Sequence, residues 1–121
     1  MNSFVFDKSK RFAVRVVRLY NYLRDEKKEF VIAKQVLRSG TSIGANLAEA
    51  EYGYSRRDFA NKLYVALKEC AETLYWLELL HNTDYLSDKQ YVDLKDDCDE
   101  IRKMLASATK TLKDDGPFPG Y

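Results

Sequence analysis

The chain has 121 residues, the size of one domain built around one hydrophobic core. With 45% hydrophobic and 32% charged residues and only 5 glycines and 2 prolines, its composition is that of a soluble, helix-rich globular protein and argues against disorder outside the ends. The formal net charge of +1 excludes a strongly basic protein, though not a local basic surface. No apolar run has the length of a signal peptide or membrane span, so we expect a single cytoplasmic domain over residues 1–121.

The apolar residues of the first predicted helix, from about Asp7 to Arg24, recur with helical spacing. One stripe consists of Phe12, Val16, Leu19 and Leu23, and a second stripe beside it consists of Ala13, Val17 and Tyr20. The second stripe exceeds what one core seam requires. The same period predicts a second helix from about Phe30 to Tyr52.

Two capping boxes mark the starts of the last two helices. In Ser55-Arg56-Arg57-Asp58 and in Ser87-Asp88-Lys89-Gln90, a serine and a side chain three residues later can satisfy free backbone N–H groups. The third helix then runs to about Asn82 and the fourth to about Leu112. Because the joints are short, consecutive helices are antiparallel, which predicts an all-α, up-down-up-down four-helix bundle.

The C-terminal tail, from about residue 114, contains both prolines and ends the last helix. It either frays or docks Phe118 and Tyr121 on a groove, and for a chain terminus we expect fraying.

The segment Leu37–Phe59, "LRSGTSIGANLAEAEYGYSRRDF", is rich in small residues within the second helix. A phosphate-binding loop is excluded, because no strand precedes the glycines and no Lys-Ser/Thr pair follows them. Gly40, Gly44 and Ala48 instead lie four residues apart on one helix side. Because glycine inside a helix costs about 1 kcal/mol relative to alanine, we expect close packing of a neighbouring helix at these positions.

This segment also carries a family resemblance. The run Gln35–Glu49, the Ser55 cap, Phe59 and the run Glu72–Leu77 resemble the four-helix-bundle proteins encoded in intervening sequences of bacterial 23S ribosomal RNA genes. In that family a proline usually stands at the position of Gly44 and a glycine at that of Ala50. The resemblance implies a homopentameric ring and no established catalytic activity. The family is also distantly similar to accessory proteins of diversity-generating retroelements. This similarity implies nucleic acid or a reverse-transcriptase-like protein as a partner.

Self-association is also consistent with the residues themselves. Aromatic rings with polar tips are common at interfaces, and the candidates here are Tyr20, Tyr64, Tyr75 and Trp76. The first helix is basic, whereas Asp93, Asp96, Asp97, Asp99 and Glu100 make the fourth acidic. Opposite patches favour a head-to-tail contact that closes into a ring, and a two-fold dimer remains the alternative.

Seven cations are candidates for a nucleic-acid interface. The first helix contributes a basic flank, Lys8, Arg11, Arg15 and Arg18, and the third helix contributes Arg56, Arg57 and Lys62. A ring would repeat these charges, and phosphate contacts gain affinity through counterion release. The alternative is that the flank is solvated or lies in an interface.

Little in the sequence suggests catalysis or a cofactor. His81 is the only histidine and lies near a helix C-terminus, where a capping role is expected, and one histidine cannot supply a di-iron site. Cys70 and Cys98 are expected to be reduced core thiols. Asp93, Asp96, Asp97 and Glu100 have the spacing for a cation site, but we favour a solvated face or subunit contact. Arg38, Asn46 and Glu49 are candidates for a buried polar network.

The sequence therefore predicts a non-catalytic oligomeric scaffold that binds RNA, DNA or a nucleoprotein partner. The alternative is a protein-only interaction or assembly module.

Overall fold

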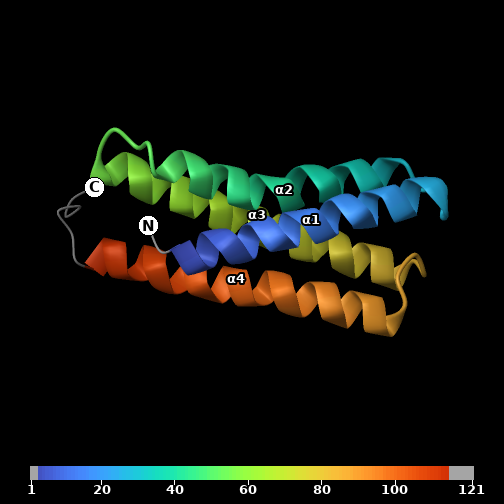
Figure 1. The fold of residues 1–121 in the computed structure, drawn as a ribbon. Helices are drawn as coiled ribbons and strands as arrows, with labels where there is room; N and C mark the ends of the chain where they lie inside the picture. The colour runs from blue at the N-terminus through green and yellow to red at the C-terminus, as the bar shows by residue number, and fades with distance from the viewer. Residues whose placement is uncertain (1–2, 115–121) are drawn as a thin grey trace.

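The four helices follow one another in an antiparallel up-down-up-down arrangement (Figure 1). The computed structural model describes residues 3–114, and its helices are α1 (Ser3–Asp25), α2 (Val31–Ala50), α3 (Arg56–Asn82) and α4 (Asp88–Asp114). Each helix packs against the next, and α4 returns beside α1 to close the bundle. The predicted all-α fold is confirmed, and the described residues contain no strand. The flexible tail predicted beyond residue 114 lies outside the described residues.

Local signals set the ends of the helices. At the start of α3, the Asp58 N–H donates to Ser55 Oγ at 3.1 Å, and the Tyr54 N–H donates to the Asp58 carboxylate at 3.0 Å. At the start of α4, Ser87 and Gln90 exchange side-chain–backbone hydrogen bonds of 2.9 and 3.1 Å. Both predicted capping boxes are therefore confirmed.

The joint after α1 relies on a left-handed residue. Lys28 has φ 56°, which turns the chain so that the Glu29 N–H reaches the Leu23 carbonyl at 2.9 Å. The Glu29 carboxylate then accepts the Ala33 N–H at 2.8 Å and so satisfies a free donor in the first turn of α2.

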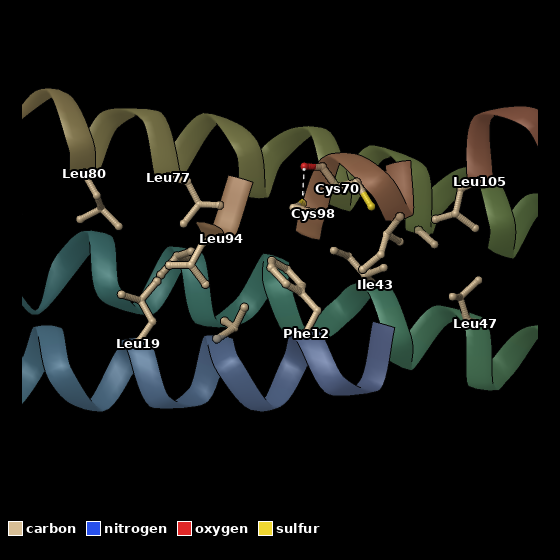
Figure 2. Close-up of a cluster of buried hydrophobic side chains, with 14 of the residues drawn as sticks. Phe12, Leu19, Ile43, Leu47, Cys70, Leu77, Leu80, Leu94, Cys98 and Leu105 are labelled. Carbon is tan, nitrogen blue, oxygen red and sulfur yellow. Dashed lines mark hydrogen bonds between the residues drawn. The ribbon is translucent and has the colours of Figure 1, made fainter. Parts of the chain in front are cut away.

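The core lies along the axis of the bundle and takes side chains from all four helices. Figure 2 shows these side chains converging between the helices, with Phe12 and Leu19 from α1, Ile43 and Leu47 from α2, Leu77 and Leu80 from α3, and Leu94 and Leu105 from α4. The described helix α1 begins four residues before the predicted Asp7, because Val5 extends the core stripe by another two turns and is itself buried.

The glycines of α2 lie against α1. A Cβ added at Gly40 would lie 2.8 Å from both methyl carbons of Val16, and one added at Gly44 would lie 3.2 Å from Ser9 Oγ. The predicted close approach is therefore confirmed, and α2 continues unbroken through Gly44 to Ala50. Within residues 3–114, none of the helices is both long and apolar enough to cross a membrane.

Candidate interaction surfaces

The basic flank predicted on α1 faces the acidic residues of α4. Lys8 Nζ lies 3.1 Å from Glu100 Oε2 and 4.0 Å from Asp97 Oδ1. Arg15 bridges two carboxylates, with Nη2 at 2.9 Å from Asp93 and Nη1 at 2.5 Å from Asp97. These four ion pairs form one seam, which we call the α1–α4 ion-pair seam.

The electrostatics of Arg15 agree with this geometry. Desolvation lowers the pKa of its guanidinium, but the hydrogen bond and charge of Asp97, together with those of Asp93, outweigh it and raise the pKa above its ordinary value. The prediction that basic α1 and acidic α4 present separate patches to neighbouring subunits is therefore wrong for these residues. They neutralise each other within one chain, because the fold places α4 beside α1.

The acidic residues of the predicted cation site on α4 also form ion pairs within the chain. Asp93, Asp97 and Glu100 are engaged by Lys8 and Arg15, and Asp96 lies 3.8 Å from Lys95 Nζ. Among residues 3–114, no group of three or more histidine, cysteine, aspartate or glutamate side chains is arranged to hold a metal ion. The cluster therefore serves the surface ion pairs of the bundle.

The other two arginines of the basic flank differ from Lys8 and Arg15. Arg11 and Arg18 are exposed, and within the described part of the chain neither forms an ion pair. They are two helical turns apart and therefore lie on one side of α1. Arg18 also lines a shallow pocket of about 280 Å³ between α1 and α4, together with Tyr22 and Gln90.

The second predicted basic cluster, at the start of α3, is partly neutralised. Lys62 Nζ lies 2.9 Å from Glu49 Oε1, and this hydrogen bond and charge raise the pKa of Lys62. Arg56 and Arg57 are exposed in the first turn of α3.

The predicted buried polar network of Arg38, Asn46 and Glu49 is wrong. The side chains of Arg38 and Glu49 are 50% and 60% exposed, and Asn46 donates to the Ser42 carbonyl of its own helix at 2.8 Å. Arg38 instead pairs with Glu72 and, at 3.3 Å, with Glu69. The charged residues thus tie α2 to α3 at the surface, because a long side chain keeps its charge in water at little cost.

The buried polar contact between α2 and α3 comes from residues that the sequence reasoning missed. Ser39 and Thr73 are fully buried and their hydroxyl oxygens lie 2.9 Å apart, while Thr73 also donates to the Glu69 carbonyl at 2.7 Å. Burial of Ser39 and Thr73 could have been predicted from the sequence, because they stand on the apolar stripes of their helices, beside Val36 and Leu77. A hydroxyl at such a position must find a partner inside the bundle.

The four aromatic candidates for an oligomer interface divide into two pairs. Tyr64 and Tyr75 are exposed, whereas Tyr20 and Trp76 are partly buried against the core. Trp76 Nε1 donates to Glu72 at 2.9 Å and packs edge-to-face with Tyr75 at 5.0 Å between ring centroids. The Arg24 guanidinium lies 5.3 Å from the centroid of the Tyr20 ring.

Exposed aliphatic residues that were not among the predicted interface residues lie on α1, the helix of Arg11 and Arg18, and on α3. Val14 and Val17 of α1 are 46% and 42% exposed, and Val65 of α3 is also exposed beside Tyr64. The second apolar stripe of the first helix was the signal, because it contains Val17, which remains exposed although Tyr20 of the same stripe packs against the core.

His81 and the two cysteines have structural contacts. His81 Nε2 lies 2.6 Å from Asp88 Oδ1, and the imidazole stacks on Tyr91 at 4.4 Å, so His81 joins the end of α3 to the start of α4. Cys70 and Cys98 are buried free thiols, as predicted. The neighbouring Cys70 and burial raise the pKa of Cys98, which keeps it a neutral thiol.

Fold and surface together define a class: a small all-α protein, a four-helix bundle whose distinctive features are charged seams and exposed apolar side chains. The chain belongs to the 23S rRNA-intervening sequence protein family, whose model matches residues 1–107. None of the curated proteins compared with the chain matches it.

A solved structure agrees with this family. The chain is similar to a protein with unknown function from the S23 ribosomal protein family of Bacteroides thetaiotaomicron VPI-5482, known from a crystal structure. The sequences are 58% identical, and the match covers 88% of this chain and 98% of that one with a TM-score of 0.87. The family resemblance predicted from Gln35–Glu49 and the following motifs is confirmed, while the function of the neighbour is unknown.

Proposed function

We propose that this protein is a non-catalytic oligomeric scaffold that binds nucleic acid, alone or in a nucleoprotein, through exposed arginines of α1. The observation that carries the proposal is the contrast within the basic flank. Lys8 and Arg15 are engaged by α4, whereas Arg11 and Arg18 are exposed on one side of α1 without an ion-pair partner in residues 3–114. Cations of this kind are available to phosphates.

Assembly is supported by the apolar residues beside these arginines. Val14 and Val17 expose nearly half of their surface, and a contiguous exposed apolar strip is a common mark of a protein interface. Burying it against another copy would place Arg11 and Arg18 at the rim, where charges remain solvated. Ring assembly would repeat both arginines in every subunit, and a homopentamer is the oligomer that the family resemblance favours.

The test compares the loss of nucleic-acid affinity when two positive charges are removed at this site with the loss when two are removed elsewhere on the surface. One variant carries Arg11→Gln and Arg18→Gln, and the control carries Lys34→Gln and Lys68→Gln, which remove the same charge from exposed positions on α2 and α3. Binding to fluorescent RNA and DNA oligonucleotides is measured by anisotropy between about 50 and 200 mM salt. Light scattering after size-exclusion chromatography gives the oligomeric state of each variant.

We expect the arginine variant to keep its oligomeric state, and the slope of log affinity against log salt to fall by about 2, one for each phosphate contact. The lysine control should lose much less affinity. Absence of binding by the unmodified protein at 50 mM salt, or equal losses in both variants, would contradict nucleic-acid binding at this site.

A protein-only assembly module is the second candidate. It is favoured by the intrachain neutralisation of Lys8, Arg15 and Lys62, which leaves fewer cations for phosphate than the sequence suggests. It predicts an oligomer that ignores nucleic acid and a protein partner that stays bound after nuclease treatment. A monomer in light scattering would contradict both candidates.

A further inference from the structure

The pocket beside Arg18, between α1 and α4, has a lining that suits one flat ring. Its volume is about 280 Å³, just below the range of sites for drug-sized ligands, so it has room for one ring system rather than a whole nucleotide. The buried side chains of Leu19, Leu86 and Leu94 give it an apolar floor. An apolar floor favours the face of a ring over a free anion.

Three side chains with polar groups surround this floor. The ring of Tyr22 is half-buried in the pocket wall, and Arg18 is exposed without an ion pair in residues 3–114. Gln90 Oε1 accepts the Ser87 N–H at 2.9 Å, which leaves the amide NH₂ group of Gln90 to donate to a ligand. The pocket therefore combines an aromatic face, a hydrogen-bond donor and a positive charge.

We propose that this pocket takes one unpaired nucleobase, so that the protein binds single-stranded RNA or DNA in preference to a duplex. The base packs against the Tyr22 ring, the Gln90 amide donates to an acceptor on the edge of the base, and Arg18 contacts the adjoining phosphate. In a duplex the bases are stacked and paired, so none of them can enter. This inference rests on the proposed nucleic-acid function and adds the form of nucleic acid that is recognised.

A second hollow continues the pocket and offers a path for the strand. It has a volume of about 500 Å³ and shares Tyr22, Leu86 and Gln90 with the first. Lys27 lines this second hollow, with Nζ 5.9 Å from the centroid of the Tyr22 ring, while Arg18 lies about one helical turn before Tyr22. Cations therefore lie on both sides of the ring, where the phosphates that flank one nucleotide would run.

The nearby carboxylates decide on which side of the pocket the phosphates lie. Asp93 lines the pocket, but its charge is matched by Arg15 Nη2 at 2.9 Å. Asp84 and Asp88 line the second hollow from the joint between α3 and α4, where they repel phosphate. The sugar–phosphate backbone is therefore expected to follow α1, with the base directed towards α4.

The first test changes the nucleic acid and leaves the protein unmodified. Three fluorescent DNA molecules of about 12 nucleotides are compared by anisotropy at low salt: a single strand, the duplex of the same sequence, and a strand in which tetrahydrofuran spacers replace every nucleoside, so that the phosphates remain without bases. We expect the single strand to bind more tightly than the duplex, although the duplex has the higher charge density. Removing the bases should weaken binding by about 5- to 150-fold, the range for loss of one stacked base.

The second test changes the pocket. Tyr22→Leu removes the aromatic face and keeps apolar bulk, and the matched control is Tyr54→Leu, a fully exposed tyrosine in the joint between α2 and α3, at the opposite end of the bundle (Figure 1). Because Tyr22 also packs against the core, Gln90→Glu is a second variant. It keeps the acceptor for the Ser87 N–H but replaces the amide donor with a negative charge.

We expect Tyr22→Leu and Gln90→Glu to lose affinity for the single strand relative to the duplex, while Tyr54→Leu keeps the ratio of the unmodified protein. Circular dichroism should show the same helix content in all variants. Equal affinity for the strand and its base-free form would overturn the base pocket and leave nucleic-acid binding in place. Equal losses in Tyr22→Leu and Tyr54→Leu, with no loss in Gln90→Glu, would also overturn it. Absence of binding to both strand and duplex would overturn the proposed function and this inference together.

Discussion

The contact between Gly40 and Val16 predicts that a single added methyl group destabilises the bundle. In Gly40→Ala, the new Cβ would lie 2.8 Å from Cγ1 and Cγ2 of Val16, which is closer than carbon atoms pack. Val16 is fully buried and β-branched, so its χ1 angle is nearly fixed in a helix and it cannot turn away. Relief therefore requires a shift of α1 relative to α2.

Two opposing terms set the size of the effect. Overpacking a well-packed core costs about 1–3 kcal/mol, whereas replacing glycine by alanine inside a helix gains about 1 kcal/mol. The expected net loss in the free energy of unfolding is therefore about 0–2 kcal/mol, centred near 1. The exposed substitution Ala45→Gly measures the helix-propensity term in the same helix without any packing change.

Urea unfolding, followed by circular dichroism at one fixed protein concentration, gives these free energies. Gly44→Ala is the matched comparison, because its Cβ would lie 3.2 Å from Ser9 Oγ, while the next nearest atoms, also of Ser9, lie at 3.7 and 3.8 Å. We expect Gly44→Ala to be more stable than Gly40→Ala. Adding Val16→Ala to Gly40→Ala should cost less than the sum of the two single changes. If Gly40→Ala instead stabilises by the full propensity gain, the helices do not meet at Gly40 as described.

Two further predictions concern polar groups. Thr73→Val leaves the buried Ser39 hydroxyl without its partner and should lower the free energy of unfolding in urea by about 1–3 kcal/mol. Adding Ser39→Ala should restore much of this loss, because no buried hydroxyl is then left unpaired. Equal stability of Thr73→Val and the unmodified chain would contradict the buried contact. Asp99 has a lowered pKa because Arg102 donates a hydrogen bond to its carboxylate and adds positive charge. Its contribution to stability is therefore present above the unfolded pKa, about 3.9, and is lost as the pH falls through the lower folded pKa. The stability difference between the unmodified chain and Asp99→Asn should shrink between about pH 5 and pH 2, and a difference that stays constant over this range would refute the linkage.

Much of the fold was predictable because its signals are local. A capping box such as Ser87–Gln90 needs only four consecutive residues, and the stripe from Phe12 to Leu23 needs only the helical period. The start of α1 was placed too late because the apolar run Phe4-Val5-Phe6 has no helical period of its own. The role of Val5 depends on the start of α3 and the end of α4, whose apolar side chains lie beside it.

The candidate site was less predictable, because contacts between helices depend on how each helix is rotated about its axis. The spacing of Lys8, Arg11, Arg15 and Arg18 places them along a common flank of one helix, but it contains no information on which of them reaches α4. In the structure Lys8 and Arg15 do so, while Arg11 and Arg18, rotated slightly further from the core, remain exposed. The same limitation explains Arg38, whose partners are 31 and 34 residues away in sequence.

The sequence by itself determined the class of fold, the number and order of the helices, the capping of α3 and α4 and the family. These properties follow from the spacing and type of residues close together in the chain. Only the tertiary structure decided which charges are neutralised, which hydroxyls are buried and which apolar residues stay exposed. Those outcomes depend on pairs of residues that packing brings together from distant segments. The spacing of side chains along one helix does not specify which residues of a neighbouring helix they will contact.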